Sequence, residues 1–455
     1  MEKLLWDQAI IEKYNYSGPR YTSYPTALEF DERFTYSQML EATQSYPKRP
    51  LSIYIHIPFC HKICYFCGCN KVITRHQEKA DKYLDHLEIE IKNQAQHFTE
   101  RTVTQLHWGG GTPTFLLPAQ ISRLMTLLRD NFNFSDNAEL SIEVDPREIE
   151  LTTIDHLANE GFNRLSLGIQ DFNKAVQKAV NREQDEAFIV KLLARAKAQG
   201  FQSTNLDMIY GLPLQNKASF AHTLEKVVEL DPARLSIFNY AHMPSLFAAQ
   251  RKINEDDMPK PAEKLAMLQH TIEFLTQSGY QFIGMDHFAK PNDELAIAQQ
   301  QGVLHRNFQG YTTQEDTDLL GMGVSAISQI GHTYSQNQKK LADYYQQVNE
   351  LGHAQWRGVS LNQDDLIRRE VIKKLICNFK LDISAIEKSF ALDFAHYFAE
   401  DIKLLQCFID DQLVSVSAQE ITVEPKGRLL IRNICMCFDI YLRNKARQQQ
   451  FSRVI

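Results

Sequence analysis

The chain has 455 residues, of which 44% are hydrophobic and 23% are charged, and its formal net charge is −7. This length and composition are typical of a globular protein with more than one domain, and the negative charge argues against a dedicated nucleic-acid-binding protein, which is usually basic. No stretch approaches the roughly 20 consecutive apolar residues of a membrane span, and the N-terminal sequence lacks the features of a signal peptide. We therefore expect a cytoplasmic protein.

Residues 1–50 form a polar, aromatic-rich N-terminal extension in which neither a helical nor a strand period is sustained. The stretch GPRYTSYPT, residues 18–26, contains one glycine and two prolines and predicts extended chain rather than helix. Arg20 within it carries a guanidinium that could pair with a carboxylate ligand. An ordinary surface arginine would look the same in the sequence.

The next segment joins a predicted strand to a cluster of cysteines. Residues 53–58 alternate apolar and polar side chains, which is the period of a half-buried strand. Four of the eight cysteines follow within ten residues, at Cys60, Cys64, Cys67 and Cys69. A four-iron cluster normally takes four cysteine ligands. The C-x3-C-x2-C spacing of the first three therefore predicts an iron–sulfur cluster with one iron open to another ligand, in a reducing compartment.

Two other interpretations of this loop stay open on spacing alone. A zinc site could combine Cys64 and Cys67 with His56 and His61, although a zinc knuckle usually brings a second close pair. A redox dithiol at Cys64-x-x-Cys67 would usually open a helix after a strand. It would also leave the other two cysteines of the loop without a role.

From residue 51 to about residue 290, predicted strands and helices alternate. Further strands are expected at residues 103–108, 140–145, 164–169, 203–210, 235–240 and 281–286, and helices at residues 184–199 and 260–277 among others. Such alternation implies parallel strands with helical crossovers, in a barrel or an open sheet. Distinctive residues lie at the strand ends: Tyr54, Gly109–Thr112, Glu143, Gln170, Asp207 and Ala241. Because catalytic groups of βα barrels gather at the C-terminal ends of the strands, this placement favours a barrel.

The last third of the chain has a different pattern. Residues 300–314 lack clear periodicity and are expected to form a loop over the barrel mouth. From residue 360 the apolar spacing is mostly helical, with a small hairpin near Leu413–Val423, which predicts a separate C-terminal domain. The remaining cysteines are expected to be buried core residues: Cys377, Cys407, Cys435 and Cys437.

The motif Cys60-x3-Cys64-x-Phe66-Cys67 resembles the signature of the radical S-adenosylmethionine (SAM) enzymes. The longer run YIHIPFCHKICYFCGCN resembles, more narrowly, the oxygen-independent coproporphyrinogen III oxidases, and the resemblance continues from GPRYTSYPT to GRLLIRNICMCFDIYLRNKARQQQFSRVI at the end. It implies an α/β fold with a partial (β/α) barrel at residues 51–290. An N-terminal extension at 1–50, a connecting segment over the active site at 291–359 and a mostly helical domain at 360–455 complete the expected organisation.

The resemblance also implies cofactors and site residues. A [4Fe-4S] cluster is expected on Cys60, Cys64 and Cys67, and its open iron would bind SAM and generate a 5′-deoxyadenosyl radical. Two SAM molecules are implied. The positions matched to the first SAM are Tyr54, Gly110, Glu143 and Ile327, and those matched to the second are Gly111, Thr112, Gln170, Arg182, Asp207 and Ala241. Phe66 matches the aromatic residue beside the cofactor adenine. The residues implied in catalysis are Tyr54, Cys69, Glu143, Phe308, Gln309, Ile327 and Arg20.

The implied reaction is the anaerobic oxidative decarboxylation of the ring A and ring B propionates of coproporphyrinogen III to vinyl groups, which gives protoporphyrinogen IX. It requires a low-potential electron donor, such as a flavodoxin-like protein, and an electron acceptor that the sequence does not identify. We expect a monomer. The alternative within the same fold is a radical SAM haem chaperone, but such relatives generally lack the cysteine represented by Cys69 and have a shorter N-terminal lead. A zinc-binding or haem-binding module without catalysis is the alternative from another class.

Overall fold

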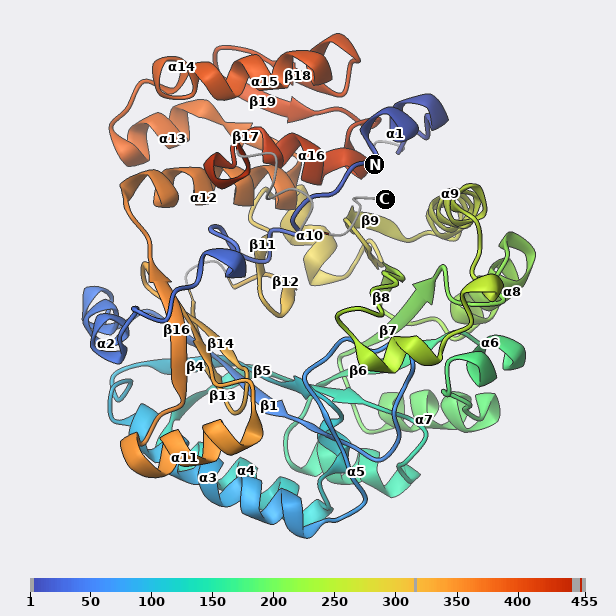
Figure 1. Ribbon diagram of the computed structural model, residues 1–455, viewed down its shortest axis with the longest axis vertical. Coiled ribbons are helices and arrows are strands. Elements are labelled where there is room, and N and C mark those ends of the chain that lie inside the picture. The colour runs from blue at the N-terminus through green and yellow to red at the C-terminus, as the bar shows by residue number, and fades with distance from the viewer. Residues whose placement is uncertain (1–3, 315–316, 444–450, 452–455) are drawn as a thin grey trace. The chain divides into compact units, whose positions relative to one another are not determined.

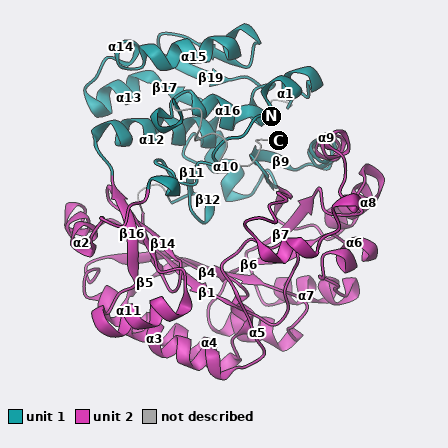
Figure 2. Ribbon diagram, in the orientation of Figure 1, with its two compact units in different colours: residues 1–29, 271–315, 361–455 teal, residues 30–270, 316–360 magenta. Residues whose placement is uncertain are grey.

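The computed structural model describes residues 4–314, 317–443 and 451, and the chain forms two compact units. The larger unit comprises residues 30–270 and 316–360, and the smaller unit comprises residues 1–29, 271–315 and 361–455 (Figure 2). Each unit is therefore assembled from segments that are far apart in the sequence. Among the described residues, no helix is both long enough and apolar enough to cross a membrane.

Parallel strands organise the larger unit (Figure 1). They are β1 (Leu51–Ile57), β4 (Thr102–Gly110), β5 (Asn133–Val144), β6 (Arg164–Gln170), β7 (Ser203–Tyr210) and β8 (Arg234–Asn239), and they pair in this order. β1 is buried at almost every position, as expected for a parallel strand that is covered on both faces. The sequence analysis predicted each of these strands, and the α/β class is confirmed.

Helices of the larger unit connect these strands and cover them. They are α2 (Tyr36–Ser45), α3 (Glu78–Ala95), α4 (Pro118–Asn131), α5 (Leu151–Asn159), α6 (Lys174–Ala179), α7 (Glu186–Ala198), α8 (Lys217–Glu229) and α11 (Leu341–Leu351). α9 (Pro261–Gln277) runs across the boundary between the units. In α3, Leu84, Leu87 and Ile91 recur at helical spacing and are buried, so one apolar face packs inward.

Further strands extend the sheet beyond β1. β13 (Asp318–Met322) lies parallel to β1, and β14 (Ile327–Ile330), β15 (Thr333–Asn337) and β16 (Gln355–Ser360) continue it with antiparallel pairings. The sequence pattern did not predict these strands. They are short, and Gly321, Gly323 and Gly331 interrupt them, so the apolar alternation never runs long enough to be recognised.

A buried ion pair links β13 to the start of β4. Arg101 donates from Nη1 to Oδ2 of Asp318 at 2.5 Å, and both side chains are only 1% exposed. Asp318 also accepts from Arg49 at 3.2 Å and from the backbone N–H of Gly331 at 3.0 Å. The second guanidinium nitrogen of Arg101 donates to the carbonyl of Thr43 at 2.8 Å. The charges of this cluster are therefore paired and hydrogen-bonded, as buried charges must be.

The smaller unit is mostly helical, as predicted for the C-terminal region. Its helices are α1 (Gln8–Tyr14), α10 (Glu294–Gln300), α12 (Gln363–Asn378), α13 (Ile383–Phe390), α14 (Phe394–Tyr397), α15 (Ala399–Asp410) and α16 (Ile431–Met436). β17 (Lys380–Asp382), β19 (Glu420–Val423) and β18 (Val414–Val416) form an antiparallel sheet in that order, which confirms the small hairpin. The stretch around Arg20 is held to α16, because the Arg432 guanidinium donates to the carbonyls of Gly18 and Pro19.

Several local predictions need correction. Residues 300–314 are not a plain loop, because β11 (His305–Asn307) and β12 (Gly310–Thr312) form a short antiparallel pair there. The strand predicted at 281–286 is β9 (Gln281–Gly284), which pairs antiparallel with β10 (His287–Ala289) in the smaller unit. The N-terminal extension contains α1 and α2, each too short to show a clear period. Cys407 is exposed rather than buried, whereas the other three C-terminal cysteines are buried.

Candidate active site

The cysteine loop is closed by a small pair of strands. β2 (Phe59–Cys60) and β3 (Val72–Ile73) pair in parallel, with Phe59 opposite Val72 and Cys60 opposite Ile73. Cys60 therefore lies at the end of β2, and Cys64, Cys67 and Cys69 lie on the loop between the strands. The loop starts directly after β1, at the C-terminal ends of the parallel strands.

The loop and the strand ends share one cavity of about 290 Å³. Its lining includes the four loop cysteines and the predicted residues Phe66, Gly110, Gly111, Thr112, Glu143, Gln170, Arg182 and Asp207. The described residues that line it do not include Tyr54, Ala241 or Ile327. The structure thus brings together most of the positions singled out in the sequence, drawn from β2, β4, β5, β6 and β7.

The donor set suits a cluster better than a single ion. Among the described residues, no three histidine, cysteine or carboxylate side chains converge tightly enough to hold one metal ion. A cubane instead takes one thiolate at each of several irons, and three cysteines around a common cavity fit that demand. A zinc site with His56 is disfavoured, because its ring nitrogens contact the Tyr54 hydroxyl at 3.1 Å and the Asn70 carbonyl at 3.0 Å. The ring of His61 packs against Phe115, with centroids 4.4 Å apart.

The loop thiols differ in their electrostatic surroundings. Burial raises the pKa of Cys60 to about 11. A hydrogen bond from Cys69 lowers the pKa of Cys67 to about 6, with a further contribution from the Lys71 ammonium, and the same contact raises the pKa of Cys69. The Thr112 hydroxyl lies 3.4 Å from Cys60 Sγ and can donate to it. The loop therefore offers hydrogen-bond donors to its own sulfur atoms, as cluster-binding loops do.

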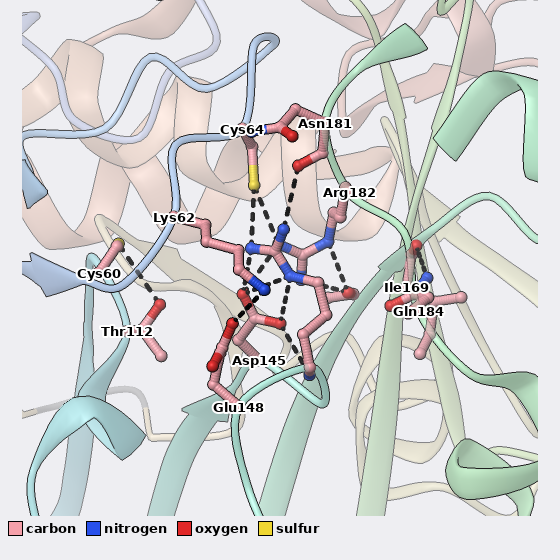
Figure 3. A network of polar contacts seen from close by, with 12 residues as sticks. Cys60, Lys62, Cys64, Thr112, Asp145, Glu148, Ile169, Asn181, Arg182 and Gln184 are labelled. Atoms are coloured by element: carbon pink, nitrogen blue, oxygen red, sulfur yellow. Dashed lines mark hydrogen bonds and ion pairs between the residues drawn. The ribbon is translucent and has the colours of Figure 1, made fainter. Parts of the chain in front are cut away.

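Cys64 faces two arginines and a carboxylate. Figure 3 shows Cys64, Asp145 and Arg182 pointing toward one another, within a network of hydrogen bonds and ion pairs. Arg182 donates to Cys64 Sγ at 3.3 Å and to Asp145 at 3.1 Å, and Arg147 donates to Cys64 Sγ at 3.2 Å. Burial raises the pKa of Asp145, but the two guanidiniums outweigh this effect and hold that pKa well below its usual range. Asp145 is therefore ionised at neutral pH.

The glycine triplet lets the backbone pass close to its neighbours. Gly110 has φ +116°, and a Cβ there would lie 2.7 Å from the His56 ring, so a side chain is excluded. A Cβ on Gly111 would lie 2.6 Å from the Pro58 carbonyl oxygen, just ahead of the cysteine loop. The N–H of Gly110 donates to Glu143 Oε2 at 3.2 Å. Glu143 and the triplet thus line adjoining parts of the cavity.

Residues at the other strand ends also make defined contacts. Asp207 accepts from Ser166 at 3.0 Å and from Asn205 at 2.8 Å, and burial raises its pKa to about 6. Gln170 closes β6 with φ +68°, a left-handed conformation that is uncommon outside glycine. The Gln250 amide donates to the carbonyls of Phe66 at 3.0 Å and Ala241 at 3.3 Å, so these two predicted positions share one buried partner.

Tyr54 and Ile327 occupy neighbouring parts of the sheet. Tyr54 lies in β1 opposite Gly321 of β13, and Ile327 begins β14. The Tyr54 ring stacks on His107, whose Nε2 lies 3.4 Å from Glu143. Burial raises the pKa of Tyr54 well above its usual value, so its hydroxyl stays protonated.

The predicted substrate-contact residues outside the cysteine loop belong to the smaller unit. Phe308 and Gln309 form the turn between β11 and β12, where the Gln309 N–H donates to Asn307 at 2.8 Å. Arg20 forms an ion pair with Asp286 at 2.5 Å. The guanidinium is 38% exposed, so it remains accessible to a carboxylate ligand while paired.

The sequence analysis missed Asp145, Arg147 and Gln250 as site residues. Asp145 and Arg147 immediately follow β5, and that position was a signal, because polar residues after the strands of a βα barrel lie at its functional end. Gln250 lies in a short 3-10 helix, Ala248–Lys252, after β8, where the sequence offered no comparable signal.

This fold, with its three-cysteine loop at the strand ends, defines a radical SAM protein. Residues 54–227 match the model of the radical SAM superfamily, and residues 361–430 match that of the HemN C-terminal domain. More narrowly, the chain belongs to the oxygen-independent coproporphyrinogen III oxidases, which are radical SAM enzymes of haem biosynthesis.

Two family members and one solved structure support this assignment. The chain is 68% identical over 455 residues to the oxygen-independent coproporphyrinogen III oxidase of Escherichia coli (strain K12), covering 100% of both chains. It is 50% identical over 460 residues to that of Pseudomonas aeruginosa, again covering 100% of both. The solved structure of coproporphyrinogen III oxidase (HemN) from Escherichia coli superposes with a TM-score of 0.94 at 65% identity, covering 97% of this chain and 100% of that one. The substrate is therefore coproporphyrinogen III, and the predicted family, fold and activity are confirmed.

Proposed function

We propose that the cavity at the cysteine loop is where this oxidase generates its radical. Cys60, Cys64 and Cys67 hold the [4Fe-4S] cluster that the family implies, and the remaining iron is left to SAM. The observation that carries this proposal is the shared cavity, in which the cysteines lie beside the glycine triplet, Glu143 and Asp145. When bound, the cluster and SAM supply one-electron cleavage of SAM to methionine and a 5′-deoxyadenosyl radical.

We assign the first SAM to the side of the cavity formed by β1, β4 and β5. Glu143 offers a carboxylate to its amino group, and the Gly110 backbone can approach closely because it has no side chain. Tyr54 supports this site through His107, which contacts both Tyr54 and Glu143. Ile327 completes the proposed set as an apolar wall. Each of these residues binds or orients the cofactor rather than reacting with it.

We assign a second SAM to the strand ends from β4 to β8. Thr112, Gly111 and Gln170 line the cavity, and Asp207 is a buried carboxylate suited to hydroxyl or amino donors. The backbone carbonyls of Phe66 and Ala241 both accept from Gln250, and these two residues would flank the adenine. Arg182 would meet a carboxylate, although it already donates to Cys64, Asp145 and the Gly168 carbonyl. Binding there would add to these contacts or exchange them.

The substrate carries four propionates. We propose that a cationic residue and residues that pack against the tetrapyrrole recognise it. Arg20 would pair with one propionate in exchange for Asp286. Phe308 and Gln309, on the β11–β12 turn, would pack against the tetrapyrrole. Cys69, an exposed residue of the cysteine loop, is the proposed active-site thiol nearest the substrate. The proposed physiological setting is a cytoplasmic monomer that is served by a flavodoxin-like or other low-potential donor and by an unidentified acceptor.

An anaerobic assay tests these assignments. The reconstituted protein receives reductant, SAM, coproporphyrinogen III and a cell extract that supplies the acceptor, and 5′-deoxyadenosine, methionine and porphyrin products are followed together. Cys64→Ser is expected to abolish all products, whereas Cys407→Ser, which alters an exposed cysteine of the smaller unit, retains them. Glu143→Gln should raise the SAM concentration needed for half-maximal rate. A fully active Cys64→Ser variant would overturn the cluster assignment.

A further inference from the structure

Arg147 is held by several hydrogen bonds beside the cysteine loop. Its Nε donates to Asp145 Oδ1 at 2.9 Å, its Nη2 donates to Asp145 Oδ2 at 2.6 Å, and its backbone N–H donates to Asp145 Oδ1 at 3.1 Å. Only Pro146 separates the two residues, and its ring fixes the backbone between them. The guanidinium is therefore locked in a bidentate fork, the arrangement in which arginine cannot be replaced by lysine.

The same fork reaches the cysteine loop by two routes. Nη2 donates directly to Cys64 Sγ at 3.2 Å, and Nη1 donates to the Asn181 carbonyl at 3.1 Å. Asn181, which has φ +54°, in turn donates from its side-chain amide to the Ile63 carbonyl at 2.7 Å. Ile63 precedes Cys64. Arg147 thus holds the sulfur atom itself and the backbone that carries it.

The charge balance among the side chains around Cys64 depends on Arg147. The side chains of Arg147, Arg182 and Asp145 are 6%, 8% and 9% exposed, so their charges act at low local dielectric. Two guanidiniums face one carboxylate and one cysteine sulfur, and the four groups are neutral together when the sulfur is a metal-ligating thiolate. Removal of Arg147 leaves the carboxylate and the thiolate against a single guanidinium.

We propose that Arg147 is a positioning residue that sets the reduction potential of the cluster through Cys64. Hydrogen bonds and positive charge at a ligating sulfur withdraw electron density from it and stabilise the reduced cluster. Arg147 provides both, and it does so whether or not Arg182 is engaged by a cofactor carboxylate. This inference rests on the proposed assignment of Cys64 as a cluster ligand. Arg147 lines the same cavity, and the role proposed for it acts through its contact with Cys64 rather than through a contact with SAM or substrate.

An ion pair with only a structural role would give a different experimental result. If the fork served only to tie the Asp145 turn to the loop, its loss would change the stability of the fold and the iron content but not the potential of clusters that do form. The midpoint potential therefore separates the two roles, and activity alone does not.

The experiment is a redox titration of the reconstituted full-length protein without SAM, monitored by electron paramagnetic resonance of the reduced cluster. Arg147→Met and Arg147→Gln, of which the second keeps an uncharged amide donor, are compared with Arg195→Met, which removes an exposed arginine paired with Asp155. Iron and sulfide contents and thermal unfolding are measured for each. We expect both Arg147 variants to have a more negative midpoint potential than the wild type, with the larger shift in Arg147→Met, and Arg195→Met to be unchanged.

The outcomes distinguish this inference from the function on which it rests. If wild-type protein binds no iron–sulfur cluster, the proposed function fails first. If the clusters form and Arg147→Met has the wild-type potential, the inference is wrong and the function stands. If Arg147→Met assembles no cluster, Arg147→Gln decides: a negative shift supports the inference and an unchanged potential refutes it.

Discussion

The buried pair of Arg101 and Asp318 gives a quantitative prediction for the larger unit. In Arg101→Met the carboxylate, which is 1% exposed, keeps only Arg49 and the Gly331 N–H as partners. Removal of one partner of a buried pair costs about 3–5 kcal/mol. Because two contacts remain, we expect the lower end of that range, a loss of about 3 kcal/mol in the free energy of unfolding.

Asp318→Asn should be more damaging than Arg101→Met. It removes the negative charge that pairs with Arg101 and Arg49 and leaves the buried Arg101 guanidinium with neutral acceptors, among them the Thr43 carbonyl, so we expect a loss of about 4–5 kcal/mol. The double variant has no uncompensated charge at this pair. Its loss in free energy of unfolding should therefore be well below the sum of the two single losses, as for any directly coupled pair.

Urea unfolding followed by tryptophan fluorescence measures these effects, because Trp108 is completely buried in β4. Arg123→Met is the matched control. Its guanidinium is 38% exposed and pairs with Asp85 and Glu88 on the surface, so its loss should cost less than about 1 kcal/mol. If Arg101→Met and Arg123→Met unfold at the same urea concentration, the buried pair does not stabilise the unit as argued.

Two further predictions concern the cysteine loop and the smaller unit. Gly111→Ala places a methyl group 2.6 Å from the Pro58 carbonyl oxygen; we expect the loop to shift and iron loading to fall severalfold, and full loading by iron and sulfide analysis would contradict this. Burial raises the pKa of Asp439 from 3.8 to about 6. Its contribution to stability is therefore fully present below pH 3.8 and is lost as the pH rises through 6, by roughly 3 kcal/mol in total. Asp439→Asn can still accept from the Tyr21 hydroxyl. Its free energy of unfolding relative to that of the wild type should therefore increase between pH 4 and 7, and a constant difference over that range would argue against the raised pKa.

The sequence was informative where a side-chain pattern repeats. The parallel strands were found because each alternates or runs apolar for six residues or more. The polar residues at their ends stood out because catalytic groups of βα barrels gather there, but their roles as site residues were implied by the family resemblance. The strands β13 to β16 were missed, because short glycine-interrupted segments carry too few side chains to show a period. The position of Arg147 just after β5 was a signal, but its contacts could not be predicted, because its partners Asn181 and Cys64 come from other parts of the chain and only the folded structure brings them together.

The order in which the segments of the two units occur along the chain also bears on synthesis. Domains generally fold as units while the chain is being made, starting from the N-terminus. Residues 1–29 are made before the larger unit, yet they belong to a unit that also needs residues 271–315 and 361–455. They must therefore wait until residues 361–455 have left the ribosome, whereas the larger unit can finish as soon as residues 316–360 are available. Synthesis of residues 361–455 would then set the moment at which the smaller unit acquires its structure.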